Sequence, residues 1–164
     1  ASNRADRRAY FAELRAWADE ASNVLAKATY LFDGDNVTFL ASAEGNKRRI
    51  ELRTGLSSSI DRGRWFFPNI KPLTIGVHKE GAYRGLRLPV LDYLVYAHNE
   101  LEISGRTGTK DSNPDYDSVR QEILDLRRAF VAEIQSVLDP RKNSKMYLRH
   151  MNRHWWSLAS SWRE

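Results

Sequence analysis

Residues 10–32 read YFAELRAWADEASNVLAKATYLF and decide the fold, because their apolar positions repeat at spacings of three and four. The positions that follow this repeat are Phe11, Leu14, Ala18, Ala21, Leu25, Ala28 and Phe32, widened on one flank by Tyr10, Trp17, Val24 and Leu31. Three apolar positions per heptad give a helix a broad buried face, typical of a bundle rather than of a two-stranded coiled coil. The stretch therefore predicts a long helix, and its central alanines allow a neighbouring helix to approach closely.

The rest of the chain predicts further amphipathic helices. One runs over about 37–62 and forms an antiparallel hairpin with the first, with Gly63 as its C-terminal stop. Another begins at Pro89. A fourth is capped by Asn113, with Pro114 at its first position, and ends before Asp139-Pro140. A fifth covers about 144–162. The sequence thus predicts an all-α fold, an antiparallel four- or five-helix bundle.

The segment between the second and third helices, residues 65–88, reads as a small hairpin-like excursion. Leu73, Ile75 and Val77 alternate with polar residues, which is the period of a strand. The turn Lys79-Glu80-Gly81 then returns the chain towards Leu88. Excursions of this length between helices are uncommon and often carry function.

Composition indicates one domain of 164 residues, 41% hydrophobic and 29% charged, with the core over about 4–140. The lack of cysteine excludes disulfides and thiolate chemistry, and is compatible with a reducing cytoplasm. No apolar run reaches the length of a membrane span. The chain opens on Ala1-Ser2-Asn3 without a methionine, so we expect a piece of a longer protein.

The formal net charge of +5 is unevenly distributed. Residues 61–88 and residues 139–164 each carry a net +4, and the remainder carries −3. Acidic partners are the natural expectation for such segments, although two ordinary solvated faces would have the same composition.

The strongest candidate for a binding site is a basic aromatic corner. Its residues come from two stretches, 62–69 and 83–87, and are Arg62, Arg64, Trp65, Tyr83, Arg84 and Arg87. Guanidinium forks suit phosphate or carboxylate, and aromatic rings stack on bases or on guanidinium groups. The alternative is structural: Phe66 and Phe67 plug the end of the bundle, and the arginines pair with carboxylates of neighbouring helices.

The C-terminal segment offers a second candidate surface. Basic and aromatic side chains there could grip nucleic acid or an anionic membrane, namely Lys142, Lys145, Arg149, Arg153 and Trp156. The same apolar stripe also fits the last helix of the bundle, and the pattern does not separate these interpretations.

No catalytic residue, metal site or cofactor is predicted. Residues 111–122 have oxygen ligands at calcium-loop spacing, but Tyr116 replaces the turn glycine, so a capped helix start is favoured. His150 and His154 lack the glutamate of a zinc protease motif. In an enzyme, His78 or His98 would be the only plausible general base.

Three stretches, residues 56–69, 83–92 and 130–140, resemble a family of uncharacterised bacterial proteins. The resemblance implies a helical cytoplasmic domain that follows a membrane anchor, and no activity. We therefore expect a non-catalytic binding or assembly module at the inner face of a bacterial membrane. Its partners would be an anionic small molecule, another protein or a second copy of the chain. A nucleic-acid-binding helical domain is the alternative.

Overall fold

The computed structural model describes residues 2–33, 37–70, 74–105 and 115–139. The elements are α1 (Ser2–Leu31), α2 (Val37–Ala41), α3 (Ala43–Phe66), a 3-10 turn (Gly81–Tyr83), α4 (Pro89–Ile103) and α5 (Tyr116–Leu138). Within these ranges the only extended pairing is one isolated antiparallel bridge, between Ile70 and Leu86. The prediction of an all-α fold is confirmed.

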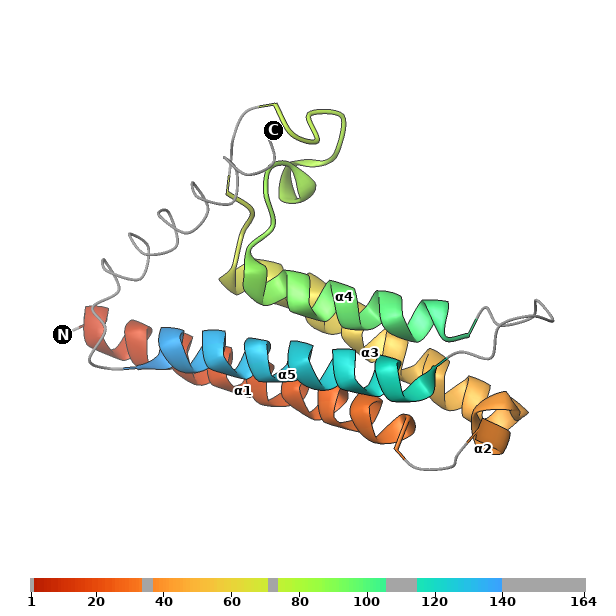
Figure 1. Ribbon diagram of the computed structural model, residues 1–164. Coiled ribbons are helices and arrows are strands. Elements are labelled where there is room, and N and C mark those ends of the chain that lie inside the picture. The colour runs from red at the N-terminus through yellow and green to blue at the C-terminus, as the bar shows by residue number, and fades with distance from the viewer. Residues whose placement is uncertain (1, 34–36, 71–73, 106–114, 140–164) are drawn as a thin grey trace.

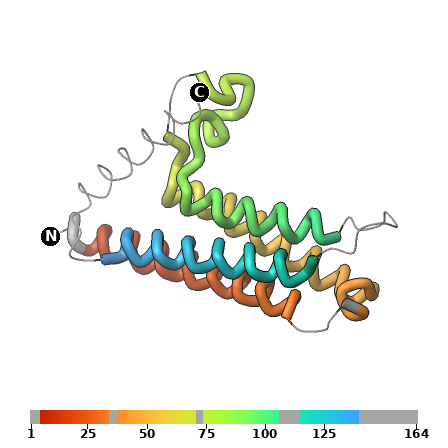
Figure 2. The backbone as a smooth tube through the Cα atoms, viewed as in Figure 1, coloured from red at the N-terminus to blue at the C-terminus, as the bar shows by residue number. Residues whose placement is uncertain are grey.

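The four long helices form an antiparallel bundle. Helix α1 packs against α3 and α5, and α4 packs against the same two helices, so the four close into a ring (Figure 1). The chain reverses direction from each long helix to the next (Figure 2). The fifth predicted helix, residues 144–162, lies outside the described residues.

The first helix has the buried face that its repeat predicts. Every alanine and leucine at the centre of the stripe is buried, and Ala21, Leu25 and Ala28 are fully so. The facing helices contribute Leu56, Leu91, Leu94, Leu101, Ile123 and Phe130 to the same core. The small central side chains allow the helices to pack closely around α1.

The second predicted helix differs at both ends. Its start is broken at Ser42, whose hydroxyl accepts from the amide of Gly45 at 3.1 Å and so caps α3. Its expected stop at Gly63 is wrong, because α3 continues to Phe66. A Cβ at Gly63 would lie 2.5 Å from Leu91 Cδ2 and 2.6 Å from Trp17 Cζ2. This glycine serves close approach within the helix, not termination.

Helix α5 begins later than predicted. Its cap is Asp115, whose carboxylate accepts from the amide of Ser118 at 3.2 Å, and not Asn113. Asn113 and Pro114 lie outside the described residues. This use of Asp115 supports the capped helix start over the calcium loop.

An aromatic cluster closes the end of the bundle where α3 finishes. The Trp17 ring lies with its centroid 5.7 Å from that of Phe67 and 5.8 Å from those of Phe66 and Phe130. Its indole nitrogen donates to the Ser59 carbonyl at 2.8 Å, so the buried ring keeps no unsatisfied donor. The structural role predicted for Phe66 and Phe67, as a plug, is confirmed.

The excursion projects from this end of the bundle (Figure 1). At its base, Ile70 and Leu86 exchange two backbone hydrogen bonds of 2.8 Å each. The strand predicted over 73–77 is wrong for its described part, since residues 74–78 form turns. Ile75 and Val77 are exposed there, so no core face holds the alternating pattern in a sheet.

Candidate functional site

The contact between Arg64 and Tyr83 is the centre of the candidate site. Arg64 lies in the last turn of α3, and Tyr83 ends the 3-10 turn of the excursion. The guanidinium carbon of Arg64 stands 4.5 Å from the Tyr83 ring centroid, a cation–π geometry. The contact thus joins the two stretches that the sequence singles out.

Backbone geometry of the excursion sets the position of Tyr83. Gly76 and Gly85 have φ of 68° and 87°, a region that favours glycine. The Gly85 amide donates to the Ile75 carbonyl at 2.9 Å, which draws the two sides of the loop together above the Ile70–Leu86 bridge. The Tyr83 ring is therefore held by a closed loop and not by the core.

Beside this contact lies a hollow of about 600 Å³. Three parts of the chain line it. Arg64 and Asn69 lie at and just after the end of α3, and Lys79 and Tyr83 belong to the excursion. Arg87 lies just before α4, and Tyr96 lies within it. Arg64 donates to the Asn69 side-chain oxygen at 3.3 Å. Its Nε is buried without a hydrogen-bond partner, and Arg64 forms no salt bridge within the described residues. A half-buried cation in this state has capacity for an anionic group.

Arg87 has a different role, since its charge is already paired. Its Nε lies 2.5 Å from the Asp92 carboxylate, in the first turn of α4. Burial raises the pKa of the Asp92 carboxyl above its ordinary value, and the hydrogen bond and charge of Arg87 act against that rise. The pair fixes one wall of the hollow, while Arg64 and Lys79 supply positive charge without a carboxylate partner in the described residues.

The remaining residues of the predicted corner lie elsewhere. Arg62 forms an ion pair with Glu20 of α1, as the structural alternative predicts. Trp65 is 76% exposed and is not part of the lining. The Nε of Arg84 donates to the Lys79 carbonyl at 2.6 Å, so this arginine closes the loop. The structure brings together Arg64, Tyr83 and Arg87, and leaves Arg62, Trp65 and Arg84 outside.

Sequence reasoning missed four lining residues: Lys79, Glu80, Asp92 and Tyr96. One signal was available for Tyr96, which falls off the apolar stripe of its helix and is 51% exposed. Lys79 and Glu80 were assigned to a turn, and their position in space follows only from the closure of the loop.

The described residues add little to the other predicted chemistries. They contain no group of three or more histidine, aspartate or glutamate side chains arranged to hold a metal ion. In the lining of the hollow, as far as the structure describes it, there is no histidine, so His78 and His98 are not part of this site. The nucleic-acid candidates Lys142, Lys145, Arg149, Arg153 and Trp156 lie outside the described residues, as do His150 and His154. None of the described helices combines the length and apolarity needed to cross a bilayer.

Comparison of the chain with protein-family models, with curated proteins and with solved structures yields no match.

Proposed function

We propose that the chain is a non-catalytic binding module whose hollow beside Arg64 and Tyr83 receives an anionic group, carried by a small molecule or by a protein partner. The observation that supports this most directly is Arg64 itself. It is half-buried, stacked on a ring and without a carboxylate partner among the described residues.

The surroundings of Arg64 favour binding of an anion. Lys79 lies in the same lining and adds a second cation without a salt bridge within the described residues; with Arg87, Glu80 and Asp92 counted as well, the described lining keeps a formal charge of +1. Tyr83 holds the guanidinium plane, which reduces the freedom lost when a ligand is bound. Tyr83 and Tyr96 are both about half exposed and offer rings and hydroxyls to whatever carries the charge.

The setting that we propose is the cytoplasmic side of a bacterial membrane, and it rests on the resemblance expected from residues 56–69, 83–92 and 130–140 alone, since no family model or curated protein matches. Within that setting the bundle would display the hollow to a dissolved ligand or to an assembly partner. We propose binding at this hollow and no reaction.

The test follows the backbone amide resonances of Asn69 and Tyr83, which line the hollow and are kept in every variant, by nuclear magnetic resonance during titration with inorganic phosphate and, separately, acetate. We expect a saturable shift that Arg64→Lys weakens at least tenfold, because lysine keeps the charge but loses the planar fork. Arg62→Lys is the matched control: it lies in the same part of α3, and its partner is Glu20.

Two results would contradict the proposal. One is a titration that never saturates in the wild-type protein. The other is equal affinity in the wild-type protein and in Arg64→Lys, which would place any anion binding elsewhere on the basic surface.

A further inference from the structure

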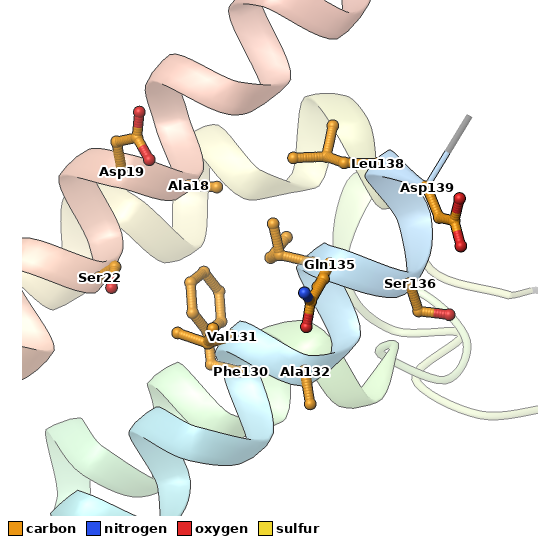
Figure 3. A pocket seen from close by; sticks show the side chains of 11 residues that line it. Ala18, Asp19, Ser22, Phe130, Val131, Ala132, Gln135, Ser136, Leu138 and Asp139 are labelled. Atoms are coloured by element: carbon orange, nitrogen blue, oxygen red, sulfur yellow. The ribbon is translucent and has the colours of Figure 1, made fainter. Parts of the chain in front are cut away.

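A second hollow lies on the opposite pair of helices, in the groove between α1 and α5 (Figure 3). Its volume is about 710 Å³. One wall consists of Ala18, Asp19 and Ser22 of α1, and the other includes Val131, Gln135 and Leu138 of α5. The groove therefore follows the last turns of α5 and ends where that helix ends.

The walls of this groove suit a packed helix. Ala18 and Ser22 are small and four residues apart, so they leave one side of the groove shallow and allow a backbone to approach. On the other wall Val131 is 44% exposed, which leaves apolar surface in contact with water. An apolar helix face placed here would remove that surface from solvent.

We propose that the groove is occupied by the chain's own C-terminal segment, as the helix that the sequence predicts over residues 144–162. Leu138 and Asp139 already line the groove, so the segment starts at its edge. Only residues 139–143 separate it from α5, a connection of the length that joins antiparallel neighbours. The predicted helix would span about 28 Å, enough to cover the whole groove.

The sequence of the segment matches the groove in pattern and charge. Its apolar residues repeat at spacings of three and four and are Tyr147, Leu148, Met151, Trp155, Leu158 and Trp162. Residues 144–162 carry Lys145, Arg149 and Arg153 and no acidic side chain, whereas the described lining of the groove contains the carboxylate of Asp19 and no lysine or arginine. The stripe would face the groove, and the basic side chains would lie on the outer side, so the apolar contact carries the docking and the opposite charges add only long-range attraction.

The absence of cysteine makes a direct test possible. In the double variant Val131→Cys with Met151→Cys, the two thiols would face each other, because both positions lie about eight residues from the connection. We expect an intramolecular disulfide to form under mild oxidation in the full chain, seen as a monomer of altered mobility on a non-reducing gel.

The matched control is Ser58→Cys with Met151→Cys. Ser58 is exposed on α3. Its neighbour Ser59 accepts a hydrogen bond from Trp17, and the Trp17 ring contacts Phe130, the residue before Val131. Ser58 therefore lies at about the same height along the bundle as Val131, but on another helix. We expect no intramolecular disulfide in this control. A covalent dimer in the Val131 variant would assign the groove to a second copy and overturn the proposal. Equal cross-linking of both pairs, or of neither, would also overturn it.

A second measurement needs no cysteine. In the wild-type chain we expect the amides of residues 147–158 to exchange at least 100-fold more slowly than in an unstructured peptide. The single change Val131→Asp should speed the amide exchange of residues 147–158 at least tenfold, while the exchange rates of the amides in α3 and α4 stay unchanged. Exchange of 147–158 at the unstructured rate in the wild-type chain would refute the docked helix.

Discussion

The last turns of α3 have two sides with opposite properties. On one side Gly63 and Phe67 are buried against Trp17, and a side chain at Gly63 has no room. On the other side Arg64 reaches a hollow and Trp65 is 76% exposed. One short piece of helix therefore closes the core and carries the candidate site. The comparison teaches that the rigid packing on one side fixes where the guanidinium of Arg64 stands on the other.

The largest difference in stability is expected between substitutions of Trp17 and of Trp65. Trp17→Ala should lower the free energy of unfolding by about 3–5 kcal/mol, because it empties a buried ring site and removes the hydrogen bond from the indole nitrogen to the Ser59 carbonyl. Chemical denaturation followed by circular dichroism measures this. The same change at the exposed Trp65 is the control and should stay within about 0.5 kcal/mol. Similar losses at both positions would abolish the distinction between the two sides of α3.

A smaller effect is expected at Gly63. Gly63→Ala should cost about 1–3 kcal/mol, since the new methyl group would overlap Leu91 and the Trp17 ring. Gly81→Ala is the control, because a Cβ there meets no atom within 4 Å. Thermal melts of both variants provide the comparison. If Gly63→Ala is as stable as the wild-type protein, the helices at this junction have room to separate.

The ion pair on the outer surface should matter less. Arg62 and Glu20 are 39% and 53% exposed, and water screens their attraction. A double-mutant cycle with Arg62→Ala and Glu20→Ala should give a coupling energy of about 0.2–1 kcal/mol, reduced by added salt. A coupling above that range would mean that Arg62 helps to hold α1 against α3.

The smallest expected effect is on the pH dependence of the free energy of unfolding, through Asp92 in the wall of the hollow. Burial raises the folded-state pKa of Asp92, so the native protein binds this proton more tightly than the unfolded chain. As pH falls from about 6 to about 4, the free energy of unfolding of the wild-type protein should rise relative to that of Asp92→Asn. Paired urea titrations across this range measure the difference. A difference that falls instead would show that Arg87 outweighs burial.

Periodicity in the sequence was enough to predict the helices but not their ends. The repeat from Phe11 to Phe32 predicted a buried face because each apolar position has a partner surface in a bundle. Gly63 looked like a stop, since glycine usually ends helices, and only the packed positions of Trp17 and Leu91 explain its place inside one. The alternation at Ile75 and Val77 failed as a strand signal because those side chains have no core to face.

The same error affected the predicted site. With a helix end at Arg62, both nearby arginines would be free to share one corner. Once α3 continues to Phe66, Arg62 and Arg64 lie about 200° apart around the helix axis, so they point to different neighbours. The meeting of Arg64 with Tyr83, by contrast, depends on the loop closure at Ile70 and Leu86, which no local pattern encodes.

That closure has a consequence for how the molecule tolerates change. Ile70 and Leu86 pair at the neck of the excursion, so the chain between them forms a closed loop outside the four-helix bundle. Insertions at its tip, around the open position of Gly81, would be absorbed without reshaping the four-helix framework. Exchanging the tip on the same neck would therefore change the surface beside Arg64 and leave the helical bundle as it is.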